Sequence, residues 1–117
     1  NSLLRDGPLR VPTIASGHES VYLSYVVTLP KDISPKRDLL ISDMRTRGIE
    51  TTIGTVHMPL SDFYQKRYRY TKGNFPMTDR AYANSLTIPM YDTLTNSDQK
   101  RIVNELDTSL RSLGFNP

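Results

Sequence analysis

Several kinds of residue that build functional sites are missing or rare in this sequence. It has no cysteine, which excludes disulfides and metal sites built on thiolates. It has only two histidines, His18 and His57, and their wide separation speaks against a histidine-rich zinc site. No apolar run approaches the roughly 20 residues that a membrane-spanning helix needs. The sequence therefore predicts no metal ligand and no membrane partner.

The sequence also lacks the short motifs of common catalytic and nucleotide-binding sites. It contains no G-x-S-x-G nucleophile elbow, no phosphate-binding loop and no dinucleotide fingerprint. Enzymes that form a Schiff base need a lysine in a shaped pocket. The lysines of this chain all stand in polar or turn-like surroundings that predict exposure: Lys31, Lys36, Lys66, Lys72 and Lys100. We therefore expect no catalytic residue and no cofactor-binding residue on this chain.

Size and charge predict one small, weakly basic domain. A chain of 117 residues can bury one hydrophobic core. The formal net charge is +3, and this small excess favours an anionic ligand over a nucleic-acid duplex. The chain starts at Asn1 rather than at methionine, and it lacks the charged and apolar regions of a signal peptide. We therefore expect a processed product or a piece cut from a longer protein.

The first half of the chain predicts a strand, a helix and a second strand. Residues 1–19 carry several glycines and prolines and predict an irregular lead-in. Residues 20–29 alternate apolar side chains on one face, which is typical of a strand. Ser34, followed by proline, predicts the start of a helix, and Gly48 predicts its end. Residues 49–53, rich in threonine and isoleucine, predict the second strand.

Short elements and a long helix follow. A short helix begins near residues 59–61, and another, capped by Thr78 or Asp79, runs to Asn84. Residues 86–88 predict a third strand.

The last helix has the clearest signals in the chain. The pattern Thr95-x-x-Asp98 predicts a capping box at its start, and Gly114 predicts its end. Its predicted apolar face consists of Ile102, Val103, Leu106, Leu110 and Leu113. Three strands and two main helices predict a two-layer α+β domain, with a three-stranded sheet and helices packed on one face.

Two segments offer candidate binding residues. His57 follows the second predicted strand in a loop, and such loops are where sites concentrate. Residues 66–72 hold four basic residues and two tyrosines, a combination that can hold phosphates and stack on bases. Each has a plain structural alternative. The histidine can make a local hydrogen bond, and the basic stretch can be a solvated connection whose tyrosines dock on the core.

An ordered set of motifs over about residues 20 to 113 resembles the C-terminal domain of the DegT/DnrJ/StrS sugar aminotransferases. The set consists of Val21-Tyr22-Leu23-Ser24-Tyr25-Val26-Val27, Arg37-Asp38-Leu39-Leu40, Arg47-Gly48-Ile49-Glu50-Thr51-Thr52-Ile53-Gly54-Thr55, Asn74-Phe75-Pro76, Ser85-Leu86-Thr87-Ile88-Pro89-Met90-Tyr91 and Thr95-x-x-Asp98-Gln99 with the helix after it.

The resemblance implies an enzyme of which this chain is one part. Members of the family are cytoplasmic homodimers that use pyridoxal phosphate to transfer an amino group, usually from glutamate, to a nucleotide-linked keto-sugar for polysaccharide biosynthesis. A larger N-terminal domain holds the cofactor and its lysine, and the smaller C-terminal domain helps to bind substrate. By this resemblance, residues 1–19 form a linker from the missing larger domain, and residues 20–117 form the small domain, inactive alone.

The two phosphates of a nucleotide-sugar indicate which residues of this chain could bind such a substrate. A diphosphate needs fixed donors, and arginine offers a planar, permanently charged fork. We therefore expect His57, Tyr64, Arg67 and Arg69 to face the substrate, with no nucleic acid as partner. We also expect the isolated chain to expose apolar residues that the larger domain would cover: Met58, Met77, Met90 and Tyr91. The alternative function is a stand-alone α+β module that binds an anionic ligand such as a nucleotide or a nucleic acid.

Overall fold

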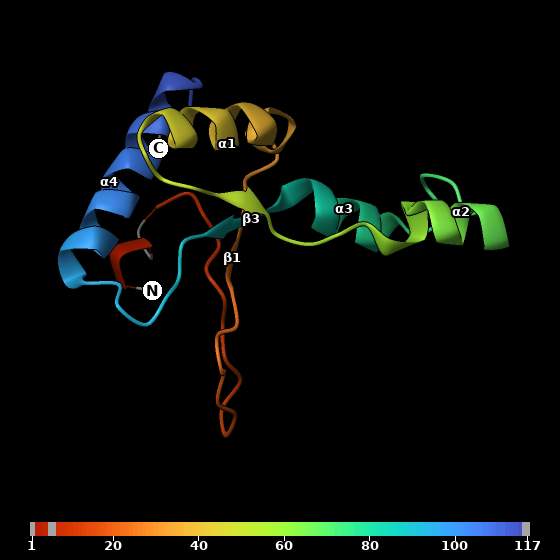
Figure 1. Cartoon of the computed structure of the whole chain (residues 1–117), viewed down its shortest axis with the longest axis horizontal. Coiled ribbons are helices and arrows are strands. Elements are labelled where there is room, and N and C mark those ends of the chain that lie inside the picture. Colours follow the sequence, from red (N-terminus) through yellow and green to blue (C-terminus); the bar gives the residue numbers. More distant parts are fainter. Residues whose placement is uncertain (1, 5–6, 116–117) are drawn as a thin grey trace.

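The structure, a computed structural model, describes residues 2–4 and 7–115 of the chain (Figure 1). The predicted lead-in and small domain also include residues 1, 5, 6, 116 and 117, which lie outside the described residues. The elements, in chain order, are η1 (Ser2–Leu4), β1 (Tyr25–Thr28), η2 (Ser34–Lys36), α1 (Arg37–Thr46), β2 (Thr52–Ile53), η3 (Met58–Leu60), α2 (Asp62–Tyr68), α3 (Pro76–Asn84), β3 (Ser85–Ile88) and α4 (Asn96–Ser112).

The strands form an antiparallel sheet with β3 at its centre, between β1 and β2. Val27 of β1 pairs with Leu86 of β3. Because side chains alternate along a strand, Val27, Leu86 and Ile88 share one face, and all three are buried. Helices α1 and α4 complete the core on this face with Leu40, Met44, Ile102, Leu106 and Leu110. The predicted two-layer α+β class, with three strands, is confirmed.

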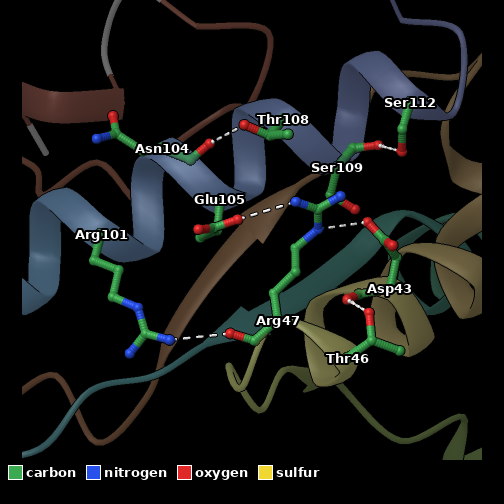
Figure 2. A network of polar contacts seen from close by, with 9 residues as sticks. All are labelled: Asp43, Thr46, Arg47, Arg101, Asn104, Glu105, Thr108, Ser109 and Ser112. Carbon is green, nitrogen blue, oxygen red and sulfur yellow. Dashed lines mark hydrogen bonds and ion pairs between the residues drawn. The ribbon is translucent and has the colours of Figure 1, made fainter.

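A polar network joins the end of α1 to α4 beside this core (Figure 2). Nε of Arg47 lies 2.9 Å from Oδ2 of Asp43, and its Nη1 lies 3.0 Å from Oε2 of Glu105 on α4. Arg101 of α4 donates to the carbonyl of Arg47 at 3.0 Å. The hydroxyl of Ser109 and the guanidinium of Arg47 hold the pKa of Asp43 below its usual value. The two helices are therefore held together by charge as well as by apolar packing.

The first strand is shorter than predicted. It spans four residues rather than residues 20–29, because its partner β3 offers only four residues for pairing. Tyr22 adopts a positive φ of 45°, which interrupts the extended backbone. Val21 and Leu23, which the predicted alternation places on one face of the strand with Val27, are 85% and 93% exposed. They belong to the loop of residues 11–24, which projects away from the sheet (Figure 1).

The lead-in is partly anchored to the core. Leu4 and Leu9 are buried, and Arg10 exchanges backbone hydrogen bonds with Thr28 at 2.9 and 3.1 Å. Its irregular conformation agrees with its glycines and prolines, since η1 is the only helix or strand among its described residues. The assignment of residues 1–19 as an interdomain linker stays a prediction.

Two predicted helix caps are wrong. Ser34 begins the short 3-10 helix η2 and makes no capping hydrogen bond, because its hydroxyl contacts the end of α3 instead. The helix α3 begins at Pro76 rather than at a cap formed by Thr78 or Asp79. The carboxylate of Asp79 is occupied elsewhere, by His57 and by the backbone amide of residue 73.

The second strand is also shorter than residues 49–53, although two residues outside its ladder, Ile49 and Thr51, are buried. Gly54 follows it at a point of close backbone approach. A Cβ at this position would lie 2.4 Å from Cβ of Ser85 and 2.7 Å from Cγ1 of Val26. Neither atom is the free end of a long side chain, so glycine is required where the chain leaves the sheet.

Candidate functional site

Residues 55–84 form an extension of the molecule that we call the arm. It contains η3, α2, the turn of residues 69–75, and α3. Figure 1 shows α3 joining the sheet directly at β3, with α2 at the end far from the sheet. All four residues predicted to bind substrate lie in the arm, which brings them into one structural unit.

A row of aromatic rings follows α2 and the turn after it. Tyr64 and Tyr68, one helical turn apart, stack with ring centroids 5.8 Å apart. Tyr68 stacks on Tyr70 at 5.4 Å, and Tyr70 meets Phe75 edge-on at 4.8 Å. Phe63 meets Tyr64 edge-on at 5.3 Å. The predicted docking of these tyrosines on the main core is not observed, because the rings pack on one another in the arm.

Exposed positive charges accompany these rings. The side chains of Arg67 and Arg69 make no hydrogen bond or ion pair with any described residue, and both are exposed to solvent. Lys66 lies 3.7 Å from Asp62, but both side chains are largely exposed, so this pair is weak. Arg69 also has a left-handed backbone, with φ of 57°, where it ends α2. The two arginines are therefore available to an anion.

His57 occupies a different place, inside the arm. Its side chain is only 7% exposed, and its Nε2 lies 2.5 Å from Oδ1 of Asp79 on α3. Oδ2 of the same carboxylate accepts a hydrogen bond from the amide of Gly73 at 2.8 Å. The hydrogen bond from His57, followed by that from Gly73, holds the pKa of Asp79 below its usual value. The pair thus ties η3, the turn and α3 together.

Nδ1 of His57 is buried and has no hydrogen-bond partner among the described residues. Since Nε2 is engaged by Asp79 and Nδ1 is covered, the ring presents no open nitrogen to a ligand in this conformation. Direct contact between His57 and a substrate stays a prediction. The sequence did not predict that Asp79 is the partner of His57, because the two stand 22 positions apart and a lone histidine gives no sign of a partner at such a distance.

An apolar groove lies elsewhere on the molecule and includes none of the four predicted residues. It is lined by η1, the base of the projecting loop, the end of β3 and the first turns of α4, with Tyr22, Tyr25, Met90 and Tyr91 among its walls. In the described part of the chain, no three acidic or histidine side chains are grouped to hold a metal ion. No described helix has the length and apolar character needed to cross a membrane.

Comparisons with solved structures show where else this fold occurs. The putative sugar aminotransferase Spr1654 of Streptococcus pneumoniae matches 96% of this chain with a TM-score of 0.86 and 18% identity. Helicobacter pylori PseC, an aminotransferase of pseudoaminic acid biosynthesis, matches 95% with a TM-score of 0.84 and 13% identity. The aminotransferase TlmJ of Streptoalloteichus hindustanus matches 96% with a TM-score of 0.80 and 26% identity.

The chain corresponds to a fraction of each of these proteins. It covers 28% of Spr1654, 30% of PseC and 29% of TlmJ. The curated relative MJ1066 of Methanocaldococcus jannaschii, described as uncharacterized, is 27% identical over 97 residues, which are 82% of this chain and 25% of that protein. Residues 1–107 match the sequence model of the DegT/DnrJ/EryC1/StrS aminotransferase family. Since this match spans most of the sequence, the chain belongs to that family.

Proposed function

We propose that the chain is the C-terminal small domain of a pyridoxal-phosphate-dependent enzyme that aminates a nucleotide-linked keto-sugar, with glutamate as amino donor. Membership of the aminotransferase family supports the reaction class. The name of Spr1654, a putative sugar aminotransferase with solved PMP and PLP forms, supports the sugar and the cofactor. The parent protein is proposed to be a cytoplasmic homodimer that takes part in polysaccharide biosynthesis.

The residues of this chain do not fit covalent attachment of pyridoxal phosphate. All of its lysines are exposed to solvent, whereas a Schiff-base lysine requires a shaped pocket. In the proposal, the cofactor is held by a larger N-terminal domain of the parent enzyme. The small domain contributes substrate binding and dimer contacts and is inactive alone.

The observation that carries the substrate proposal is the pair of exposed arginines beside the tyrosine row of the arm, whose side chains have no partner among the described residues. A nucleotide-sugar carries two phosphates, and the forks of Arg67 and Arg69 are suited to hold them. The ring of Tyr64, or those of Tyr68 and Tyr70, would stack on the base or on the sugar. Such stacking contributes about 1–3 kcal/mol per base in single-strand binding proteins.

Substrate kinetics of the full-length enzyme test this proposal. The double variant Arg67→Ala/Arg69→Ala should raise KM for the nucleotide-sugar and leave KM for glutamate largely unchanged, because glutamate lacks the diphosphate. Arg45→Ala, which removes an exposed arginine of α1, is the matched control and should change neither value. Equal effects on both substrates, or no effect on either, would refute the role of the arm.

The alternative function, a stand-alone module for an anionic ligand, rests on the same exposed arginines. It predicts that the isolated chain binds a nucleoside diphosphate tightly and loses this binding in the double variant. Under the aminotransferase proposal, the isolated chain binds such a ligand weakly, because the rest of the site lies in the larger domain. Titration calorimetry of the isolated chain separates the two functions.

A further inference from the structure

The C-terminal end of α3 is where the arm joins the body of the molecule. The last carbonyls of a helix have no partner within the helix and need donors from elsewhere. Here the amide of Leu29 donates to the carbonyl of Asn84 at 2.7 Å. The hydroxyl of Ser34 lies 3.0 Å from the carbonyl of Ala83 and 2.6 Å from Oδ1 of Asn84, and donates its proton to one of them. The guanidinium of Arg37 donates from Nη1 to the carbonyl of Tyr82.

Arg37 makes the most specific of these contacts. Its Cζ lies 4.9 Å from the centroid of the Tyr82 ring, so the guanidinium both stacks on this side chain and binds its carbonyl. The charge is placed at the C-terminal end of α3, where the helix dipole favours a cation. The planar fork of arginine serves both contacts at once, which the ammonium of lysine cannot do.

The burial of Arg37 calls for a reason other than stability. Its side chain is only 8% exposed, and the nearest carboxylate, Asp38, is 3.3 Å away and 87% exposed. Burying a charge with so loosely held a partner is expensive, and an apolar residue of similar volume often serves stability as well or better. A buried arginine at this junction is better explained by the orientation that its contacts give to α3 relative to the body of the molecule.

The contacts continue from Tyr82 into the arm. The Tyr82 ring meets the ring of His57 edge-on, with centroids 5.4 Å apart. His57 in turn binds Asp79, which holds the amide of Gly73 in the turn after α2. An unbroken series of contacts therefore runs from α1, in the body, to the turn after α2, which begins at Arg69.

We propose that Arg37 is a positioning residue, which fixes the direction of the arm relative to the sheet and so places Arg67 and Arg69 for the substrate. The inference rests on the proposed function for the role of the two arginines. The mechanical part, that Arg37 fixes the arm, stands on the contacts of the chain itself. Arg37 touches no substrate in this proposal and acts through Tyr82 and His57.

A distance measurement on the 117-residue chain tests the mechanical part without any substrate. The native sequence has no cysteine, so Gln65→Cys on α2 and Lys100→Cys on α4 give two unique positions for spin labels. Both are exposed and lie in the arm and in the body. We expect pulsed electron–electron double resonance to give one narrow distribution of the distance between the two spin labels. Arg37→Met should lose the narrow peak and give a broad distribution.

Two further variants serve as control and rescue. Arg45→Met removes an exposed arginine from the same helix and should keep the narrow peak. Arg37→Lys retains the charge and can donate a hydrogen bond but lacks the planar fork, so it should restore the peak in part. An unchanged distribution in a folded Arg37→Met chain, or equal broadening in Arg45→Met, would overturn the proposal.

If circular dichroism shows that Arg37→Met is unfolded, Tyr82→Leu takes its place. It removes the stacked ring but keeps the carbonyl, and an unchanged peak there overturns the proposal equally.

Kinetics of the full-length enzyme test the link to substrate. Arg37→Met should raise KM for the nucleotide-sugar roughly tenfold, since misplacement by a small distance is costly, with little change for glutamate. If Arg37 served stability alone, the variant would contain less active enzyme. The apparent kcat would then fall while KM stayed unchanged for both substrates, and this result would overturn the link. If Arg37→Met broadens the distance distribution but Arg67→Ala/Arg69→Ala leaves the kinetics unchanged, the mechanical role of Arg37 stands and the proposed role of the arm in substrate binding is refuted instead.

Discussion

At the residue scale, the pairing of His57 with Asp79 shows how one contact can organise a segment. The carboxylate accepts from a side chain on one side and from the amide of Gly73 on the other. Both hydrogen bonds favour its charged form, so the folded chain holds the pKa of Asp79 below the ordinary value of 3.8. A carboxyl group whose pKa is lower in the folded chain than in the unfolded chain stabilises the folded state at every pH at which it is ionised in both.

Asp79→Asn should therefore destabilise the chain at neutral pH. The contribution of Asp79 is fully present above its unfolded pKa, near 3.8, and is lost as pH falls through the lower folded value. The difference in unfolding free energy between native chain and variant should thus be largest at pH 7 and shrink below about pH 4. Urea unfolding at pH 7 and pH 3 measures it. Asp92→Asn, at an exposed position, is the control. A difference that is constant with pH would contradict the assignment.

At the element scale, α4 is the element with the strongest local signals. The hydroxyl of Thr95 accepts from the amide of Asp98 at 3.1 Å, and Oδ2 of Asp98 accepts from the amide of Thr95 at 3.1 Å. The predicted capping box is thereby confirmed. These two reciprocal bonds satisfy backbone donors that the first turn of a helix leaves free.

Removing the cap should weaken the helix measurably. Thr95→Ala should lower the free energy of unfolding by about 1 kcal/mol, the usual loss when an N-cap hydroxyl is deleted. Thr93→Ala, at an exposed position outside the helix, is the control and should have little effect. Chemical denaturation of the three chains gives the comparison. An effect of Thr95→Ala no larger than that of the control would show that the box contributes nothing to stability.

The elements differ in how far their sequence predicts them. The capping box and apolar face of α4 are local patterns, so the helix is found where it is expected. The alternation of residues 20–29 is also local, but a strand exists only where it has a partner, and the length of β3 cannot be read from β1. This is why the predicted strand wrongly included Val21 and Leu23.

The same contrast explains the candidate site. Tyr64, Arg67 and Arg69 are neighbours in the sequence, and one short helix and its end bring them together. The contacts of Asp79 and Arg37 were not predicted, because their partners, His57 and Tyr82, stand 22 and 45 positions away. Only the folded chain places them in contact.

At the scale of the whole molecule, the shape is more extended than its size requires. The Cα radius of gyration is 15.6 Å, whereas a compact domain of this length would have about 13.4 Å. The arm and the projecting loop account for this extension (Figure 1). They also carry apolar side chains with high exposure, including Leu23 at 93%, Met77 at 71% and Met58 at 53%. Tyr91, beside the apolar groove, is 53% exposed, while Met90 is partly buried.

Such a surface predicts association of the isolated chain. Scattered apolar residues are normal on a soluble domain, but apolar surface gathered on projecting segments is typical of an interface. We expect the chain to self-associate in sedimentation experiments and to bind an apolar fluorescent dye. Met58→Gln/Met77→Gln should reduce both signals, whereas Leu39→Gln, an exposed apolar residue on α1, should leave them unchanged. A strictly monomeric chain without dye binding would argue against its being one domain of a larger enzyme, because the surface proposed to meet the larger domain would then need no cover.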